Sequence, residues 1–306
     1  MDYYIYRLKF KTPVHFGNGR LNGSIGVIYA DTLFSALCCE AVSMYGKNGA
    51  EKLYNAVNDG KMLISDTMPY ADTLYLPKPM TLVESNEKGD SSLKKKFKNL
   101  KYIPVNDLND YLSGGYIPKE IEFGKDDIRV CVRVNEEEDS EPFDIGIYDF
   151  LHNENEKQST GLYFIAGLTD DFCKTFDELM TSLSYSGIGG KRSSGYGKFD
   201  FEKTRDTEFT DRIKGKFKTY MSLSVSMTDG EELKNVIPNA SYELIRRSGF
   251  VFSEDYSDDP LKKRDMYCFK GGACFDTRFD GKIFDVSDGG AHPVYRYAKP
   301  LLFGIK

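Results

Sequence analysis

A glycine-rich stretch, Ser186 to Phe199 (SGIGGKRSSGYGKF), carries the residue types best suited to binding an anion. Glycine permits positive φ and close approach of the backbone to a ligand, and successive N–H groups in such a loop form a concave anion site. The stretch therefore predicts a phosphate-binding turn that spans residues 186–197. Its expected ligand contacts are Gly187, Gly189, Gly190, Lys191, Arg192, Ser193, Ser194 and Tyr196, whose ring can stack on a base.

Two familiar glycine motifs do not account for this stretch. A P-loop requires a lysine after its last glycine, but Tyr196 follows Gly195 here. A Rossmann motif follows a strand and opens a helix, whereas this stretch follows a helical pattern and opens a strand pattern. An ordinary flexible connection remains the alternative, although five glycines interleaved with cations and hydroxyls argue against it.

A single histidine, His15, lies in a second glycine-containing loop near the N-terminus. Beside a phosphate, a histidine can act as general base on a ribose 2′-OH. The other histidines, His152 and His292, are remote in sequence. We expect a structural or RNA-contacting role for His15 and keep catalysis as the alternative. Arg20, in the same loop, is a further expected RNA contact.

The start of the first predicted helix supplies another set of polar side chains. Helix N-termini attract phosphates, and Thr32 and Ser35 can donate hydrogen bonds there. Asp31 would repel a phosphate, so we predict that it is the helix N-cap.

Two groups of cations lie outside these loops. Arg246 and Arg247 interrupt an apolar strand pattern, and neighbouring strand residues face opposite sides. Only one of them can therefore face a groove, and we expect the other to face solvent or to pair with an acid. The lysine run 94–101 either forms a solvated face or binds backbone phosphates, and the sequence favours neither alternative.

The elements that position these residues alternate between strand and helix periodicity. Their order predicts an α+β protein with two ferredoxin-like (RRM-like) domains, at 1–205 and 216–306, joined by a linker at 204–216. A hairpin-bearing insertion is expected at about 70–159, with an acidic turn at 135–141. Predicted first-domain strands are 3–11, 61–65, 128–134, 161–167 and 198–203, and helices are 31–45, 50–57 and 170–185. Second-domain strands are expected at 220–227, 242–252, 265–270 and 292–298.

Composition narrows the class of protein further. The 306 residues contain no apolar run long enough for a membrane span, and the N-terminus lacks a signal-peptide pattern, so the cytoplasm is expected. Six cysteines without a CxxC pair and three histidines make a zinc site improbable, and no cofactor is predicted. A net charge of −6 argues against non-specific nucleic-acid binding, but not against a local basic groove.

Three segments together resemble the RAMP superfamily, the RNA-binding ferredoxin-like proteins of CRISPR systems. They are FKTPVHF at 10–16 with IGVIYADTLFSALC at 25–38, LKKKFKNLKYIP at 93–104 with YLSG at 111–114, and GIGGKRSSGYGKF at 187–199. Their order is similar to that of the type III-A subunit that holds the 5′ end of the crRNA. The resemblance covers the first 200 residues well and the remainder only by size and strand content.

This resemblance implies a role in antiviral defence through RNA binding without catalysis. The repeat-derived 5′ tag of the crRNA would be gripped by this protein, which would contact the large polymerase-like subunit and a backbone RAMP subunit of the Csm complex. Two alternatives stay open. One is a metal-independent RAMP endoribonuclease with His15 as general base, and the other is a ferredoxin-like protein that binds small nucleotides.

Overall fold

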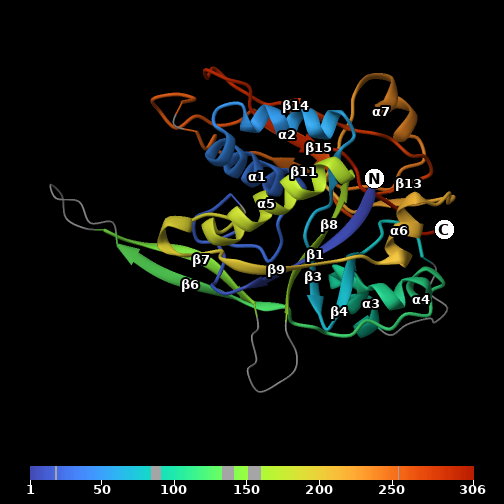
Figure 1. The fold of residues 1–306 in the computed structure, drawn as a ribbon. Coiled ribbons are helices and arrows are strands. Elements are labelled where there is room, and N and C mark those ends of the chain that lie inside the picture. The colour runs from blue at the N-terminus through green and yellow to red at the C-terminus, as the bar shows by residue number, and fades with distance from the viewer. Residues whose placement is uncertain (18, 84–90, 133–140, 151–159, 254) are drawn as a thin grey trace.

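A seven-stranded antiparallel sheet forms the centre of the computed structural model, which describes residues 1–17, 19–83, 91–132, 141–150, 160–253 and 255–306 (Figure 1). β1 (Asp2–Phe10) lies between β8 (Thr160–Leu168) and β9 (Phe199–Thr204). β2 (Met62–Ile64) and β3 (Met68–Ala71) both pair with β8, and β4 (Thr73–Pro77) and β5 (Tyr102–Pro104) extend the sheet beyond β3.

The central strands are buried on both faces, and for β8 this explains its continuous apolar sequence, TGLYFIAGL. Alternate residues point to opposite sides. Tyr6 and Phe164 belong to the core on one face, whereas Ile5, Tyr163 and Ile165 belong to a second core on the other face. Each face is therefore covered by a different part of the chain.

Three helices cover the first face. They are α1 (Ala30–Tyr45), α2 (Gly49–Asn58) and α5 (Asp170–Ser186), and α1 packs against both of the others. α1 ends at Gly46, whose φ of 76° suits glycine. Gly49 allows α2 to approach α1, because a Cβ there would lie 2.1 Å from the Ala41 carbonyl oxygen.

The predicted first-domain elements are confirmed to within one residue at each end, apart from the strand 128–134. Its residues 128–132 lie in β6 (Gly124–Val132), and 133–134 lie outside the described residues. β6 pairs with β7 (Pro142–Phe150) in a hairpin. A bridge between Val14 and Tyr148 joins the base of this hairpin to the N-terminal segment. The turn expected at 135–141 lies outside the described residues, apart from Glu141.

The rest of the expected insertion adds short elements at one end of the sheet. β3, β4 and β5 belong to the main sheet itself. They are accompanied by α3 (Ser91–Asn99), η1 (Val105–Asp107) and α4 (Leu108–Leu112). α3 carries most of the lysine run, and Lys94, Lys95, Lys96 and Lys98 are exposed on it.

The linker expected at 204–216 is wrong, because these residues contain α6 (Thr207–Lys214). The Asp206 carboxylate accepts a hydrogen bond from the Phe209 N–H and caps the helix. Phe209 and Ile213, four residues apart, are buried in the core on the second face of the sheet. The segment is thus a packed element of the fold.

The C-terminal strands form small sheets, and one short helix accompanies them in the described residues after α6. The four strands expected here from the sequence are each shorter than predicted. β10 (Tyr220–Ser222) lies between β13 (Cys274–Phe275) and β16 (Leu302–Gly304). β11 (Leu244–Arg247) pairs with β12 (Met266–Phe269), and β14 (Lys282–Asp285) pairs with β15 (Tyr295–Ala298). The helix is α7 (Gly230–Val236).

The C-terminal part shares its core with the N-terminal part. Val225, Cys268, Ile283 and Tyr297 lie in the same cluster as α1, α5 and the main sheet. The buried Tyr297 hydroxyl accepts from the Ile64 N–H at 2.9 Å and lies 3.2 Å from the Ile64 carbonyl oxygen. Within the part of the chain that the structure describes, no helix has the length and apolarity needed to cross a membrane.

Candidate functional site

The glycine-rich loop folds against the loop that carries His15. The Gly190 N–H donates to the His15 carbonyl at 2.9 Å, and the Gly197 N–H donates to that of Pro13 at 3.0 Å. A Cβ at Gly190 would lie 2.6 Å from His15 Cδ2, and one at Gly197 would lie 2.1 Å from the Ile188 oxygen. Two segments far apart in sequence therefore meet closely, and glycine is required at the contact.

Several loop glycines have the positive φ expected of them. Gly187, Gly189, Gly195 and Gly197 have φ between 76° and 102°, and Lys191 adopts the left-handed conformation at 59°. The N–H groups of Gly187, Gly190 and Gly197 donate hydrogen bonds to backbone carbonyls of the protein. These three N–H groups are therefore already used within the protein and do not face an anion.

The two loop cations lie against aromatic rings from other parts of the fold. Lys191 Nζ is 4.9 Å from the ring centre of Phe143 in β7, and Arg192 Cζ is 5.2 Å from that of Phe252. Both distances are within cation–π range. Arg192 Nη1 also lies 3.6 Å from the buried Glu40 carboxylate of α1. The loop is thus joined to the hairpin, to α1 and to the C-terminal part.

The remaining predicted loop residues point toward solvent to different degrees. Ser193 and Ser194 are exposed, and they form η2 (Arg192–Ser194) together with Arg192. Tyr196 is half-buried. The hydroxyls beside Arg192 are therefore accessible to a ligand.

His15 is buried and held against β7. It is 8% exposed, and its Nδ1 lies 2.6 Å from the Gly146 carbonyl oxygen. The Gly146 N–H in turn donates to the carbonyl of Leu21 in the turn that carries the exposed Arg20. Of the other two histidines, His292 contacts the Ser253 hydroxyl, and His152 lies outside the described residues. These contacts fit a structural role for His15.

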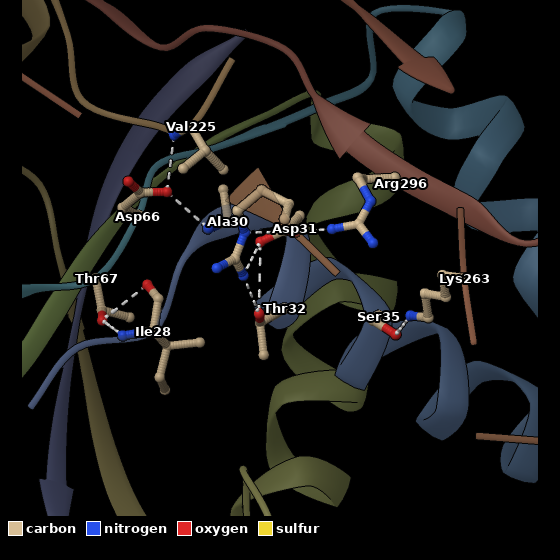
Figure 2. Close-up of polar contacts among 11 residues, drawn as sticks. Ile28, Ala30, Asp31, Thr32, Ser35, Asp66, Thr67, Val225, Lys263 and Arg296 are labelled. Carbon is tan, nitrogen blue, oxygen red and sulfur yellow. Dashed lines mark hydrogen bonds and ion pairs between the residues drawn. The ribbon is translucent and has the colours of Figure 1, made fainter. Parts of the chain in front are cut away.

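The expected N-cap role of Asp31 is wrong. Tyr29 occupies the N-cap position without a side-chain cap. A carboxylate from outside the helix, that of Asp66, takes the place of a side-chain cap. Its Oδ1 accepts from the N–H of Ala30 at 2.7 Å and from that of Val225 at 2.9 Å (Figure 2). Asp66 therefore fixes the start of α1 to the C-terminal part.

Asp31 is instead the anion of a buried ion cluster. Its carboxylate accepts from Arg247 Nη2 at 2.8 Å and Nε at 3.0 Å, and from Arg296 Nη1 at 2.9 Å. The side chains of Asp31 and Arg296 are about 5% and 4% exposed. Burial raises the pKa of Asp31, but Arg247 and then Arg296 outweigh it and hold that pKa below its ordinary value.

Burial also shifts the pKa values of two groups near this cluster, the Asp66 carboxyl and the Lys263 amine. Burial raises the pKa of Asp66 to about 7, although its two N–H donors act in the opposite direction. Burial, with the nearby Arg296 charge, lowers the pKa of Lys263. Among the described residues, no group of three or more His, Cys, Asp or Glu is placed to hold a metal ion.

Thr32 and Ser35 contact C-terminal cations. Thr32 Oγ1 accepts from Arg247 Nη2 at 3.0 Å, and Ser35 Oγ accepts from Lys263 Nζ at 3.4 Å (Figure 2 shows the latter). The side chain of Arg246 is 59% exposed and pairs with Asp265 at 3.1 Å, whereas that of Arg247 is 17% exposed. The adjacent arginines thus face opposite sides, as expected, and both pair with an acid.

Sequence reasoning did not identify five residues that form the polar and cation–π contacts of this site: Glu40, Asp66, Phe252, Lys263 and Arg296. Each lies in an ordinary local pattern, such as the YRYA of β15, and gains its partners only through contacts distant in sequence. Glu40 carried the clearest available signal, since a carboxylate within an apolar helix face needs a buried partner.

Comparison with known proteins decides the family. Residues 7–200 match the RAMP superfamily, and residues 215–305 match the CRISPR Csm4 C-terminal domain. A Mycobacterium tuberculosis protein described as CRISPR system Cms protein Csm4 is 34% identical over 313 residues, spanning 100% of this chain and 98% of its own length. The chain belongs to the Csm4 family of the RAMP superfamily. The resemblance noted in the sequence is therefore confirmed.

Other Csm4 relatives agree in length and fold. The protein of the same description from Streptococcus thermophilus is 31% identical over 316 residues and matches along the full length of both chains. A chain of the Csm3–Csm4 subcomplex of the type III-A interference complex superposes with a TM-score of 0.64 at 16% identity, covering 100% of both chains. A chain of a Csm1–Csm4 cassette with AMPPNP gives 0.62 at 19% identity, covering 99% and 98%. At these identities the structures show a common fold.

Proposed function

We propose that this chain is the crRNA-binding subunit of a cytoplasmic type III-A (Csm) ribonucleoprotein in antiviral defence. It would grip the repeat-derived 5′ tag of the crRNA and dock the large polymerase-like subunit and a backbone RAMP subunit. Membership of the Csm4 family supports this assembly, as do the solved cassettes and subcomplex in which Csm4 relatives accompany Csm1 or Csm3.

One structural observation carries the RNA-binding part of the proposal. The glycine-rich loop presents Lys191, Arg192 and two exposed hydroxyls at a junction with the hairpin and the C-terminal part. The chain as a whole is acidic, with a net charge of −6. A local group of cations on an acidic protein favours a defined phosphate ligand over non-specific binding.

We further propose that the protein does not cut RNA. A general base must reach the proton it abstracts, whereas His15 is buried with Nδ1 against the Gly146 carbonyl. The alternative endoribonuclease is tested by incubating the protein with repeat RNA and a chelator. Cleavage that disappears in His15→Ala would contradict the proposal.

The same proposal includes the finer architecture, two ferredoxin-like domains at 1–205 and 216–306 with an insertion at about 70–159. The first is supported by the antiparallel strand order β9-β1-β8-β2, with α1 and α5 packed together on one face. The second would be a reduced version, in which α7 follows β10 and precedes the β11–β12 pair.

The tag-gripping function is tested with the protein in complex with its large partner. Affinity is measured for crRNAs with native or scrambled tags, each joined to two different spacers. Scrambling should cost about 1–3 kcal/mol per base whose edge contact is lost, and changing the spacer should cost almost nothing. Equal affinity for native and scrambled tags would leave only a phosphate clamp that is blind to sequence.

The phosphate contact itself is tested by removing the loop cations. Lys191→Ala with Arg192→Ala should weaken crRNA binding and flatten its dependence on salt, because each phosphate contact releases counterions. An unchanged affinity and salt slope would show that RNA phosphates bind elsewhere.

A further inference from the structure

Two phenylalanine rings stand exposed beside the glycine-rich loop. Phe250 is 58% exposed and Phe252 is 75% exposed. Large apolar side chains in a polar setting cost free energy in water when left uncovered, and grouped ones mark binding surfaces. The pair is therefore a candidate binding surface, and its surroundings indicate what it would bind.

The backbone fixes the outward direction of both rings. Phe250 forms an antiparallel bridge with Lys262, and the Val251 N–H donates to the Leu261 carbonyl at 2.9 Å. In such an extended segment, alternate side chains point to opposite sides. Val251 packs inward on the apolar cluster around Tyr256, so the residues on either side of it are turned outward.

Each ring has its own cation. Lys262 Nζ lies 5.5 Å from the centre of the Phe250 ring, and Arg192 Cζ lies 5.2 Å from that of Phe252. Arg192 is oriented by Glu40, which also accepts from the Ser182 and Ser186 hydroxyls. The guanidinium is therefore held beside one ring, while most of that ring stays accessible.

This arrangement suits single-stranded nucleic acid. A base offers a flat π-face for a phenylalanine ring, and the phosphates on either side of it are complementary to lysine and arginine. Side chains two residues apart on an extended strand begin about 6.7 Å apart, so each ring has room for its own base. A protein partner could cover the rings but would not by itself explain a cation at each one.

We propose that Phe250 and Phe252 form a stacking platform for two neighbouring unpaired bases of the bound RNA, with Lys262 and Arg192 contacting the adjoining phosphates. The platform rests on the proposed RNA-binding function and extends it, because it adds base stacking from the C-terminal part to the phosphate contacts of the glycine-rich loop. Stacking tolerates any base, so the platform holds bases without reading their identity.

The test uses the full chain in complex with the large subunit and synthetic RNAs that carry the repeat-derived tag. One nucleotide at a time is replaced by an abasic ribose phosphate, which removes the base and keeps the charge. We expect two neighbouring positions at which the abasic change lowers affinity roughly tenfold. In the double variant Phe250→Ala with Phe252→Ala, affinity for intact RNA should fall, and these two abasic effects should disappear.

A salt titration separates stacking from charge. The phenylalanine variants should keep the wild-type salt slope, whereas Lys262→Ala with Arg192→Ala should flatten it. Ile117→Ala is the matched control, because Ile117 is 64% exposed and follows α4 in sequence. α4 lies at the other end of the molecule from the C-terminal end of α5 (Figure 1). The RNA affinity of this control variant should be unchanged, and circular dichroism verifies the fold of each variant.

The outcomes distinguish the platform from the function on which it rests. Failure of the wild-type complex to bind the RNA would overturn both. Wild-type affinity and unchanged abasic effects in the phenylalanine variant would overturn the platform alone. Loss of co-purification with the large subunit, with RNA affinity retained, would instead assign the two rings to a protein interface and reject the platform.

Discussion

At the scale of single residues, two neighbouring arginines show how burial decides the energy of an ion pair. Arg247 and Arg246 are adjacent in β11 and both contact an aspartate. The partner of Arg247 is the buried Asp31, whereas Arg246 pairs with Asp265 at the surface. Removing one member of a buried pair leaves an uncompensated charge in a poorly solvated site, while an exposed pair loses little.

Arg247→Met should therefore lower the free energy of unfolding by about 3 kcal/mol, because Arg296 alone must then compensate Asp31. Arg246→Met is the matched control and should change it by less than about 1 kcal/mol. Urea denaturation of both variants checks the prediction. Equal effects of the two substitutions would show that the cluster around Asp31 does not behave as a buried pair.

At the scale of elements, the start of α1 and the glycine-rich loop are both held by partners from other segments. Asp66 joins the first N–H of α1 to Val225. The loop after α5 is held by the carbonyls of Pro13 and His15. Both elements form where periodicity predicts them, but their orientation depends on contacts with distant segments.

Asp66 should make stability depend on pH. Its pKa is raised from 3.8 to about 7, so between these values the folded protein keeps a proton that the unfolded chain has lost. The free energy of unfolding therefore falls as pH rises from about 4 to 7. Relative to Asp66→Asn, wild type should lose up to about 4 kcal/mol across this range, since one pKa unit is worth about 1.4 kcal/mol.

Denaturation of wild type and Asp66→Asn at pH 4 and pH 8 measures this difference. The asparagine side chain of the variant has no carboxyl proton to lose but retains an oxygen that can accept from both N–H groups. Titrating groups distant from Asp66 cancel in the comparison, and Asp31, whose lowered pKa acts in the opposite direction, is present in both proteins. Parallel pH profiles would show that the Asp66 carboxyl is solvated.

Gly190→Val should damage RNA binding more than folding. Its Cβ would approach His15 Cδ2 at 2.6 Å, so the loop must move and displace Lys191 and Arg192. We expect a roughly tenfold loss of crRNA affinity with the circular dichroism spectrum preserved. Loss of the fold without a separate binding defect would mean that this glycine serves packing only.

At the scale of the whole molecule, one core spans both predicted domains. C-terminal residues such as Tyr297 and Ile283 lie in the cluster beneath α1, and Met221 and Phe303 cover the second face of the main sheet. The two faces of the sheet are therefore completed only when the C-terminal part is in place.

The full chain should unfold in a single cooperative transition, with the same midpoint by circular dichroism and by tyrosine fluorescence. Residues 1–205 expressed alone should associate or bind a hydrophobic dye, because Ile5, Tyr163 and Ile165 lose much of their cover. Two separate transitions in the full chain, or a stable monomeric fragment, would show that the two parts fold independently.

The sequence by itself determined the elements whose stability comes from local pattern. The alternation of β1, the apolar run of β8 and the helical spacing of α1 and α5 each predict one buried surface, and their ends were confirmed to within one residue. The glycine-rich loop was also recognisable, since its composition suits few other structures. The family followed from three such segments taken together.

Only the tertiary structure decided which charges meet. Asp31 lies 216 residues from Arg247 and 265 from Arg296, and no local periodicity relates residues so far apart. α6 was misjudged for a similar reason, because the packing of Phe209 and Ile213 against the main sheet outweighs weak local helix propensity. Phe250 and Phe252 appear in the sequence as strand residues, and only the burial of Val251 shows that both rings face outward.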